Sequence, residues 1–266
     1  MAKISSEAKK RYFDKVQEYK KAAEAILERE KNVQQTIRGE EAGEQYRRLN
    51  LADERLNLAS YYLLLNRISV SLLGVKNEAF LNDARKSCYQ AIIYLEEVVT
   101  SYIDAPFSEY SEYLEKIEEL EDTKRHDLMR KLGFTIQSVE EDFGDNTKWR
   151  WSFVELEGRY AVVCKNIIDM KNVLAGLDPR VPGYEARVGH LKLAKQLLQQ
   201  AADRYREKYE ISTTRIDDFK RAIEFLGALR RLHVVLGESD NAEVVKRKMD
   251  VWKSKMETDE RQARQK

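Results

Sequence analysis

Apolar residues recur alternately four and three residues apart over most of this chain, and this spacing constrains the fold more than any other feature of the sequence. An α-helix turns once every 3.6 residues, so residues with this spacing lie along one side of a helix. The first such stripe consists of Tyr12, Val16, Tyr19, Ala23, Ile26, Glu30, Val33 and Ile37. The pattern predicts an all-α protein in which long antiparallel helices pack along coiled-coil-like seams.

Stripes of the same kind predict about seven or eight helices in all. They run over 49–73, 81–102, 149–174, 191–205, 216–236 and 244–256. Residues that commonly cap or end helices stand at the boundaries: Ser5 or Ser6, Gly39, Gly74, Asn77, Thr147, Gly176 and Gly237. The stripe over 149–174 has no polar interruption, so one unbroken helix is expected there.

The segment between the third and the fourth stripe is expected to separate two helical bundles. A tyrosine-rich helix that begins at Ser108 and becomes highly charged is expected to end at Gly133, with its charged second half in solvent. Ser138 and Glu141 have the spacing of a capping box for a short helical turn, so 133–147 is the expected hinge.

These boundaries predict the organisation of the whole chain. It consists of an N-terminal bundle over 1–104, a charged connecting helix and hinge over 105–147, a C-terminal bundle over 148–257 and a flexible tail over 258–266. We expect two connected bundles with a bent-rod outline.

Composition excludes several classes of function. The 47 basic and 46 acidic side chains leave a net charge of +1, so no overall field favours nucleic acid or an anionic membrane. The sequence contains no stretch of about 18 uncharged apolar residues, so no membrane span is predicted. The N-terminus lacks the apolar core of a signal peptide, so a soluble cytoplasmic protein is expected, or a periplasmic one if the sequence is that of a mature exported chain.

Motifs for catalysis, cofactors and metals are missing from the sequence. The three histidines stand apart from one another, without Glu-x-x-His or His-Glu-x-x-His spacing, and the glycines are scattered singly. Cys88 and Cys164 lack CxxC spacing and lie in apolar patterns, so both are expected to be buried thiols. A nucleophilic Cys164 would need a histidine from elsewhere in the chain. We therefore expect that the protein is not an enzyme and that it binds no cofactor, metal or small-molecule substrate.

Aromatic residues off the apolar stripes are the candidates for binding a partner protein. Trp149 lies on its stripe, but Trp151 is turned by about 200° around the same helix. Trp151 therefore either packs under the 133–147 segment or anchors a partner together with Arg150, because Trp, Tyr and Arg are favoured in binding hot spots. Tyr110 and Tyr113 have the same two interpretations.

The last helix offers another candidate surface. It is basic and carries Trp252, so it either binds an acidic partner or presents a solvated face. Two polar residues, Glu30 and Asn66, occupy positions within the seams. For Asn66 we consider both a role in fixing the register of helix packing and simple exposure at the edge of the seam.

One segment resembles a known class of proteins. The run WRWSFVELEGRYAVVCKN, from Trp149 to Asn166, together with the tyrosine-rich helices, resembles the all-helical coiling and sheath scaffold proteins of spirochaete flagellar filaments. The resemblance implies a non-enzymatic structural role around a filament, with no catalytic residues.

The function expected from the sequence is therefore that of a structural or scaffolding protein that contacts other proteins or further copies of itself. A helical-repeat adaptor is one alternative, although it would need self-similar units of roughly 34 to 45 residues. A helical enzyme would need an internal cavity lined by polar groups. A membrane-remodelling coiled coil would need a basic concave face, which the near-neutral charge disfavours.

Overall fold

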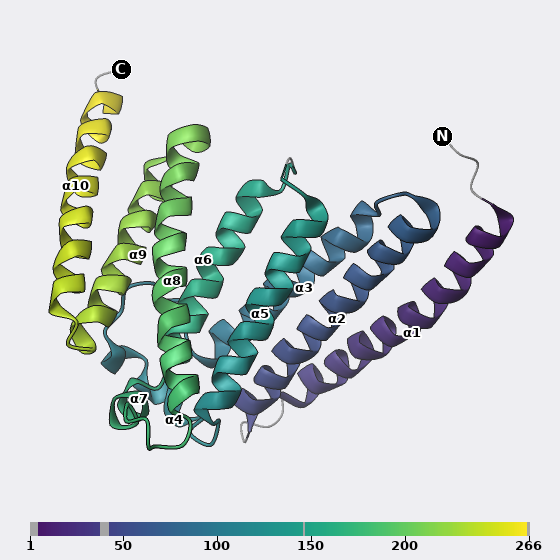
Figure 1. Cartoon of the computed structure of the whole chain (residues 1–266), viewed down its shortest axis with the longest axis horizontal. Coiled ribbons are helices and arrows are strands. Elements are labelled where there is room, and N and C mark those ends of the chain that lie inside the picture. The colour runs from purple at the N-terminus through teal and green to yellow at the C-terminus, as the bar shows by residue number, and fades with distance from the viewer. Residues whose placement is uncertain (1–4, 38–42, 146, 265–266) are drawn as a thin grey trace. The chain divides into compact units, whose positions relative to one another are not determined.

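A computed structural model describes residues 5–37, 43–145 and 147–264 of the chain (Figure 1). Within these residues it contains ten α-helices, a short 3₁₀-helix and a turn of π-helix, and no β-strand. The all-α prediction is confirmed, with slightly more helices than expected because two short ones, α4 and α7, lie between the long ones. Contacts divide the chain into two compact units, and α5 contributes to both.

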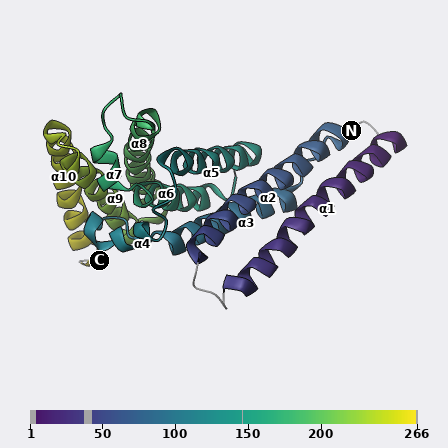
Figure 2. The ribbon, with the colours of Figure 1, turned by 90° about the horizontal axis from the view of Figure 1, so that it is seen from below.

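The first unit contains the chain up to Val98 together with Leu128–Lys148. Its helices are α1 (Ser6–Ile37), α2 (Glu44–Leu73), α3 (Glu78–Val98) and most of α5 (Asp122–Phe143). The helix α2 packs against both α1 and α3, which lie on either side of it in Figure 1, and Figure 2 shows α1 running alongside α2. This agrees with the five consecutive apolar residues from Tyr61 to Leu65, which cover the whole circumference of α2.

Several predicted helix boundaries in this unit are confirmed. The hydroxyl of Ser5 accepts a hydrogen bond from the amide of Ala8, at 3.1 Å, and caps α1. Gly74 ends α2 in the left-handed conformation, and the side chain of Asn77 caps α3. Gly39 lies outside the described residues.

The prediction that a helix ends at Gly133 is wrong. Gly133 lies in the interior of α5, and so do Ser138 and Glu141, so there is neither a capping box nor a hinge at 133–143. A glycine within a helix costs only about 1 kcal/mol. Burial of an apolar stripe outweighs this cost, and the stripe consists of Met129, Leu132, Ile136, Val139 and Phe143. The expected connecting segment 105–147 is accordingly divided between the two units.

The second unit contains Val99–Asp127 and the chain from Trp149 onward. Its elements are η1 (Phe107–Glu109), α4 (Ser111–Glu115), α6 (Arg150–Asn166), α7 (Met170–Ala175), α8 (Tyr184–Lys208), η2 (Tyr209–Thr213), α9 (Ile216–Val235) and α10 (Ser239–Arg264). The long helices pack in sequence, α6 on α8, α8 on α9 and α9 on α10. Gly158 permits the first of these contacts, because a β-carbon there would lie 2.7 Å from the ring of Tyr205.

The unbroken helix predicted over 149–174 is interrupted in the structure. The helix α6 ends at Asn166, whose side-chain amide donates to the carbonyl oxygens of Thr100 and Tyr102 at 3.0 and 3.2 Å. Asp169 then caps the separate helix α7 by accepting from the amides of Lys171 and Asn172. The start also differs, because Trp149 rather than Thr147 occupies the cap position of α6.

The C-terminal segment is more ordered than the sequence suggests. The expected flexible tail begins at residue 258, but α10 continues to Arg264. Side-chain contacts hold this part of the helix, since Asp259 accepts hydrogen bonds from Tyr209 and Lys255 at 2.8 and 2.7 Å. No helix in the described part of the chain is both long enough and apolar enough to cross a bilayer.

Candidate functional site

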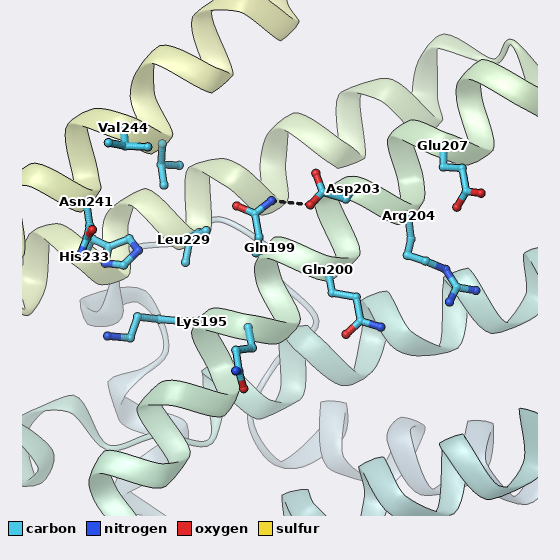
Figure 3. Close-up of a pocket in the computed structure, with 12 residues that line it drawn as sticks. Lys195, Gln199, Gln200, Asp203, Arg204, Glu207, Leu229, His233, Asn241 and Val244 are labelled. Atoms are coloured by element: carbon cyan, nitrogen blue, oxygen red, sulfur yellow. Dashed lines mark hydrogen bonds between the residues drawn. The ribbon is translucent and has the colours of Figure 1, made fainter. Parts of the chain in front are cut away.

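An open groove lies between α8 and α10, with α9 at its base (Figure 3). Its volume is about 840 Å³. Both flanking helices pack along α9, and the hydrogen bond from Lys248 on α10 to Asp203 on α8, at 2.8 Å, links them across the groove. Leu229 and Val245 supply apolar surface, and Val244 lies at the α10 side.

One end of the groove is built around the carboxylate of Glu238. This carboxylate accepts hydrogen bonds from Nζ of Lys195, at 2.8 and 3.2 Å, and it bonds to Nδ1 of His233 at 2.5 Å. Burial raises the pKa of Glu238, but the two hydrogen-bonded partners outweigh this effect and hold the pKa below its usual value. The group is therefore an ionised carboxylate that joins α8, the end of α9 and the start of α10.

The other charged side chains of the groove are also paired within the chain. Asp203 accepts from Gln199 at 2.7 Å, as the dashed line in Figure 3 marks, as well as from Lys248. At the far end, Arg204 donates to Glu157 at 3.2 Å, and Glu207 accepts from Arg150 at 2.5 Å. The charges of the groove are thus balanced locally, and the exposed amides of Gln196, Gln200 and Asn241 remain as its accessible polar groups.

The structure brings a histidine to Cys164, but not in a catalytic arrangement. Nε2 of His190 lies 2.9 Å from the carbonyl oxygen of Cys164, so the backbone rather than the thiol occupies this ring nitrogen. Burial lowers the pKa of His190 to about 3, despite the opposing hydrogen bond. Burial also raises the pKa of the Cys164 thiol far above its ordinary value, and that of Cys88 to about 12. Both thiols are buried, as predicted, and neither is an activated nucleophile.

The described ranges 5–37, 43–145 and 147–264 contain no candidate metal centre. No group of three or more His, Cys, Asp or Glu side chains is gathered there in a way that could hold an ion. His126 and His190 stack with ring centroids 5.7 Å apart, but no carboxylate or thiol joins them in such a group.

The aromatic partner-binding candidates are placed differently from one another. Tyr110 and Trp252 are buried, each only 4% exposed, so neither is accessible as an anchor. Trp252 packs on Phe219, and the guanidinium of Arg206 lies over its ring. Tyr113 is exposed.

Trp151 is half-buried, so both of its predicted roles stay predictions. The guanidinium of Arg150 lies 4.9 Å from the centre of its ring, and Arg150 also pairs with Glu207 beside the groove. The expected cluster of Trp151 and Arg150 therefore exists as a local contact at the start of α6.

Both polar residues of the seams are buried and paired. Asn66 accepts from the amide of Asn77 at 2.9 Å and donates to Asp142 at 3.2 Å, so it lies inside the packing rather than at an exposed edge. Glu30 is bound by Arg55, with oxygen–nitrogen distances of 2.8 and 2.6 Å, and by the hydroxyl of Tyr94. These contacts join α2 to the start of α3 and to α5, and join α1 to α2 and α3.

The amino-acid sequence does not indicate the groove. Lys195, Gln199 and Asp203 repeat every four residues, a pattern that by itself indicates a solvated helix face. Only the position of α10 beside that face turns it into the wall of a groove.

The fold and the groove define a class: an all-α protein of successively packed helices with an accessible, charge-balanced surface groove. The chain belongs to the TP0443 family, whose model matches residues 8–260. This is a Treponema-type family, which is compatible with the spirochaete part of the resemblance seen in the sequence. No curated protein and no solved structure matches the chain.

Proposed function

We propose that this protein is a non-enzymatic scaffold that binds an α-helical segment of another protein in the groove between α8 and α10. The observation that carries this proposal is the open groove itself, in which α8 and α10 pack along α9 and leave a path of about 840 Å³ between them. A helix laid into this path would complete a four-helix arrangement, and amphipathic helices commonly bind in such grooves.

The chemistry of the groove favours an occupant with small apolar and uncharged polar side chains. Lys195, Asp203, Arg204 and Glu207 are all bound to partners in the chain, so a charged ligand would have to break existing ion pairs. Breaking a partly buried pair costs free energy, because it leaves one charge without its partner. The accessible amides can donate and accept hydrogen bonds, and Leu229, Val244 and Val245 offer apolar contact.

The helical-repeat adaptor remains a second candidate, because one feature of the fold favours it. The order of packing, α6 on α8, α8 on α9 and α9 on α10, resembles the neighbour-to-neighbour stacking of repeat proteins. The helices are unequal, however, with 17, 25, 20 and 26 residues. Association with a filament rests on the sequence resemblance alone.

The proposal can be tested with a matched pair of variants on α10. Val244 lines the groove and is 65% exposed, whereas Val251 lies two turns further along, is 67% exposed and does not line it. Either valine can be replaced by glutamate with little effect on stability, because both side chains are in solvent. Tagged wild-type protein and the two variants would be used to capture partners from extracts of the native cells.

We expect Val244→Glu to lose a partner that wild type and Val251→Glu both retain. Solution mass, measured by light scattering, identifies the case in which the occupant is a second copy of the chain, since Val244→Glu would then convert a dimer to a monomer. Equal capture by all three proteins, with equal solution mass, would contradict the proposal.

A further inference from the structure

Lys165 is a buried lysine without an ion-pair partner. It lies near the end of α6 and is only 6% exposed. Its Nζ lies 4.9 Å from the centre of the Tyr110 ring, and no carboxylate or other hydrogen-bond acceptor in the described part of the chain lies within bonding distance of it. Lysine is rarely buried to this extent unless it is paired, because removing an ammonium from water is costly.

The Lys165 side chain lines a small pocket in the second unit. The pocket measures about 30 Å³, room for about two water-sized groups when one water needs about 10–15 Å³. Its walls are mostly apolar, with Phe107, Met170 and Leu232 among them, and its other cation is Arg231. It is partly open to solvent, so a ligand can place one end inside and leave the remainder at the mouth.

The ion pair beside the pocket is formed by Arg231 and does not include Lys165. Arg231 donates from Nε to Asp104 at 2.8 Å, and this pair neutralises itself. Gly227 makes room for that carboxylate on α9, because a β-carbon there would lie 2.5 Å from Oδ2 of Asp104. Asp104 also attracts Lys165, and Glu109 attracts Arg231. Neither carboxylate forms an ion pair with Lys165, whose ammonium lies next to an aromatic ring and apolar walls.

We propose that this pocket binds the carboxylate of a short aliphatic monocarboxylate, with Lys165 as its counter-ion. The two oxygens of a carboxylate match the size of the cavity, and its single charge matches the ammonium of Lys165, which has no ion-pair partner. Inorganic phosphate has four oxygens and carries up to two charges, so it fits less well. The apolar walls would contact the alkyl chain. This inference concerns a different surface from the groove and is independent of the proposed scaffold function.

The burial of Lys165 has a chemical consequence that makes the site measurable. Burial lowers its pKa to about 8, against the attraction of Asp104 and together with the repulsion of Arg231. A larger fraction of this amine is therefore neutral and able to react with an acylating reagent than is usual for lysine. A carboxylate bound at Nζ would both stabilise the ammonium and block access to it.

The test compares wild-type protein with Lys165→Met and with the exposed control Lys171→Met on α7. The thermal midpoint would be measured with sodium butyrate, sodium chloride and sodium phosphate at matched ionic strength. We expect butyrate to raise the midpoint of wild type and of Lys171→Met in a concentration-dependent way, and to leave Lys165→Met unchanged. An equal response of wild type and Lys165→Met would overturn the proposal, and so would a chloride or phosphate response as large as that to butyrate.

A second measurement uses only the wild-type protein and does not depend on the folding of a variant. The rate at which a small amine-specific reagent acylates Lys165 would be followed by mass spectrometry, with Lys171 as the internal reference. We expect saturating butyrate to slow acylation of Lys165 at least tenfold while Lys171 reacts at the same rate. Unchanged acylation of Lys165 would contradict the proposal.

Discussion

The guanidinium of Arg125 donates a hydrogen bond of 2.8 Å to the carbonyl oxygen of Ile167, the C-cap residue that follows α6. The same side chain donates to the carbonyl oxygens of Leu120 and Ile117, at 2.8 and 2.7 Å. Arg125 is 1% exposed, although it lies in the charged segment expected to be solvated. It joins the start of α5 to two other parts of the second unit.

Replacement of Arg125 by lysine should therefore destabilise the protein strongly. One ammonium cannot reach three carbonyl oxygens in the geometry that the guanidinium fork provides. Hydrogen bonds to a charged group contribute about 1.5–3 kcal/mol each, so we expect the free energy of unfolding to fall by about 3 kcal/mol or more. Urea denaturation followed by circular dichroism measures this change. A loss below about 1 kcal/mol would show that these bonds contribute little.

His190 should make the protein sensitive to acid. Its pKa is about 3 in the folded state and 6.5 in the unfolded chain, so the unfolded state binds more protons between these values. The stabilisation is complete above pH 6.5 and is lost as the pH falls toward 3. At pH 4.5 the loss from this residue should reach about 3 kcal/mol, at about 1.4 kcal/mol per pH unit.

The variant His190→Gln tests this source of acid sensitivity. Glutamine can still donate to the Cys164 carbonyl but does not titrate, so the variant should lose less stability than wild type between pH 7 and pH 4.5. Parallel losses in the two proteins would assign the acid sensitivity to other groups.

Lys165 has a pKa shift of the same sign as His190, so its contribution to stability also rises with pH, but in the alkaline range. Its pKa is about 8 when folded and 10.5 when unfolded, so the unfolded state again binds more protons, and wild-type stability gains from this group as the pH rises between these values. Below pH 8 the buried charge costs about 3 kcal/mol. In buffers without carboxylates, Lys165→Met should be more stable than wild type at pH 7.

That advantage of Lys165→Met should shrink by about 2 kcal/mol between pH 7 and pH 9.5, because wild type progressively loses the buried charge. The difference in unfolding free energy between the two proteins measures it and cancels the titration of the other groups. An advantage that stays constant with pH would mean that the pKa of Lys165 is not lowered in the folded protein.

Asn66 is expected to contribute to the stability of the first unit through its two buried hydrogen bonds. Asn66→Leu would leave the amide of Asn77 and the carboxylate of Asp142 each without one of its partners. Unsatisfied buried groups of this kind cost about 1–3 kcal/mol, and we expect a loss of that size in the free energy of unfolding. A neutral or stabilising effect would instead indicate that apolar packing replaces the polar contacts fully.

The sequence predicts those helices whose apolar stripe is local, and it fails where distant residues decide. The helices α1, α2, α3, α8, α9 and α10 follow from spacing within each segment. The end of α6 at Asn166 does not, because it depends on Thr100, Tyr102 and Arg125, which lie more than 40 residues away in the chain. The helix end predicted at Gly133 is wrong because burial of the neighbouring apolar side chains outweighs the weak helix propensity of this glycine.

The candidate sites are harder to predict from the sequence than the helices are. In the sequence, the residues that line the groove have the pattern of solvated helix faces. The burial of Lys165 depends on Tyr110, which is 55 positions away in the chain. In contrast, burial of Cys88 and Cys164 could be predicted, because each lies within the apolar stripe of its own helix.

Binding in the groove can be tested most directly by placing a photo-crosslinking amino acid at position 244, with position 251 as the control, in protein produced in its native cells. We expect irradiation to join position 244 to one helical segment of a partner protein, identified by mass spectrometry, and we expect position 251 not to give this product. Identical products from both positions, or none from position 244, would contradict binding in the groove between α8 and α10.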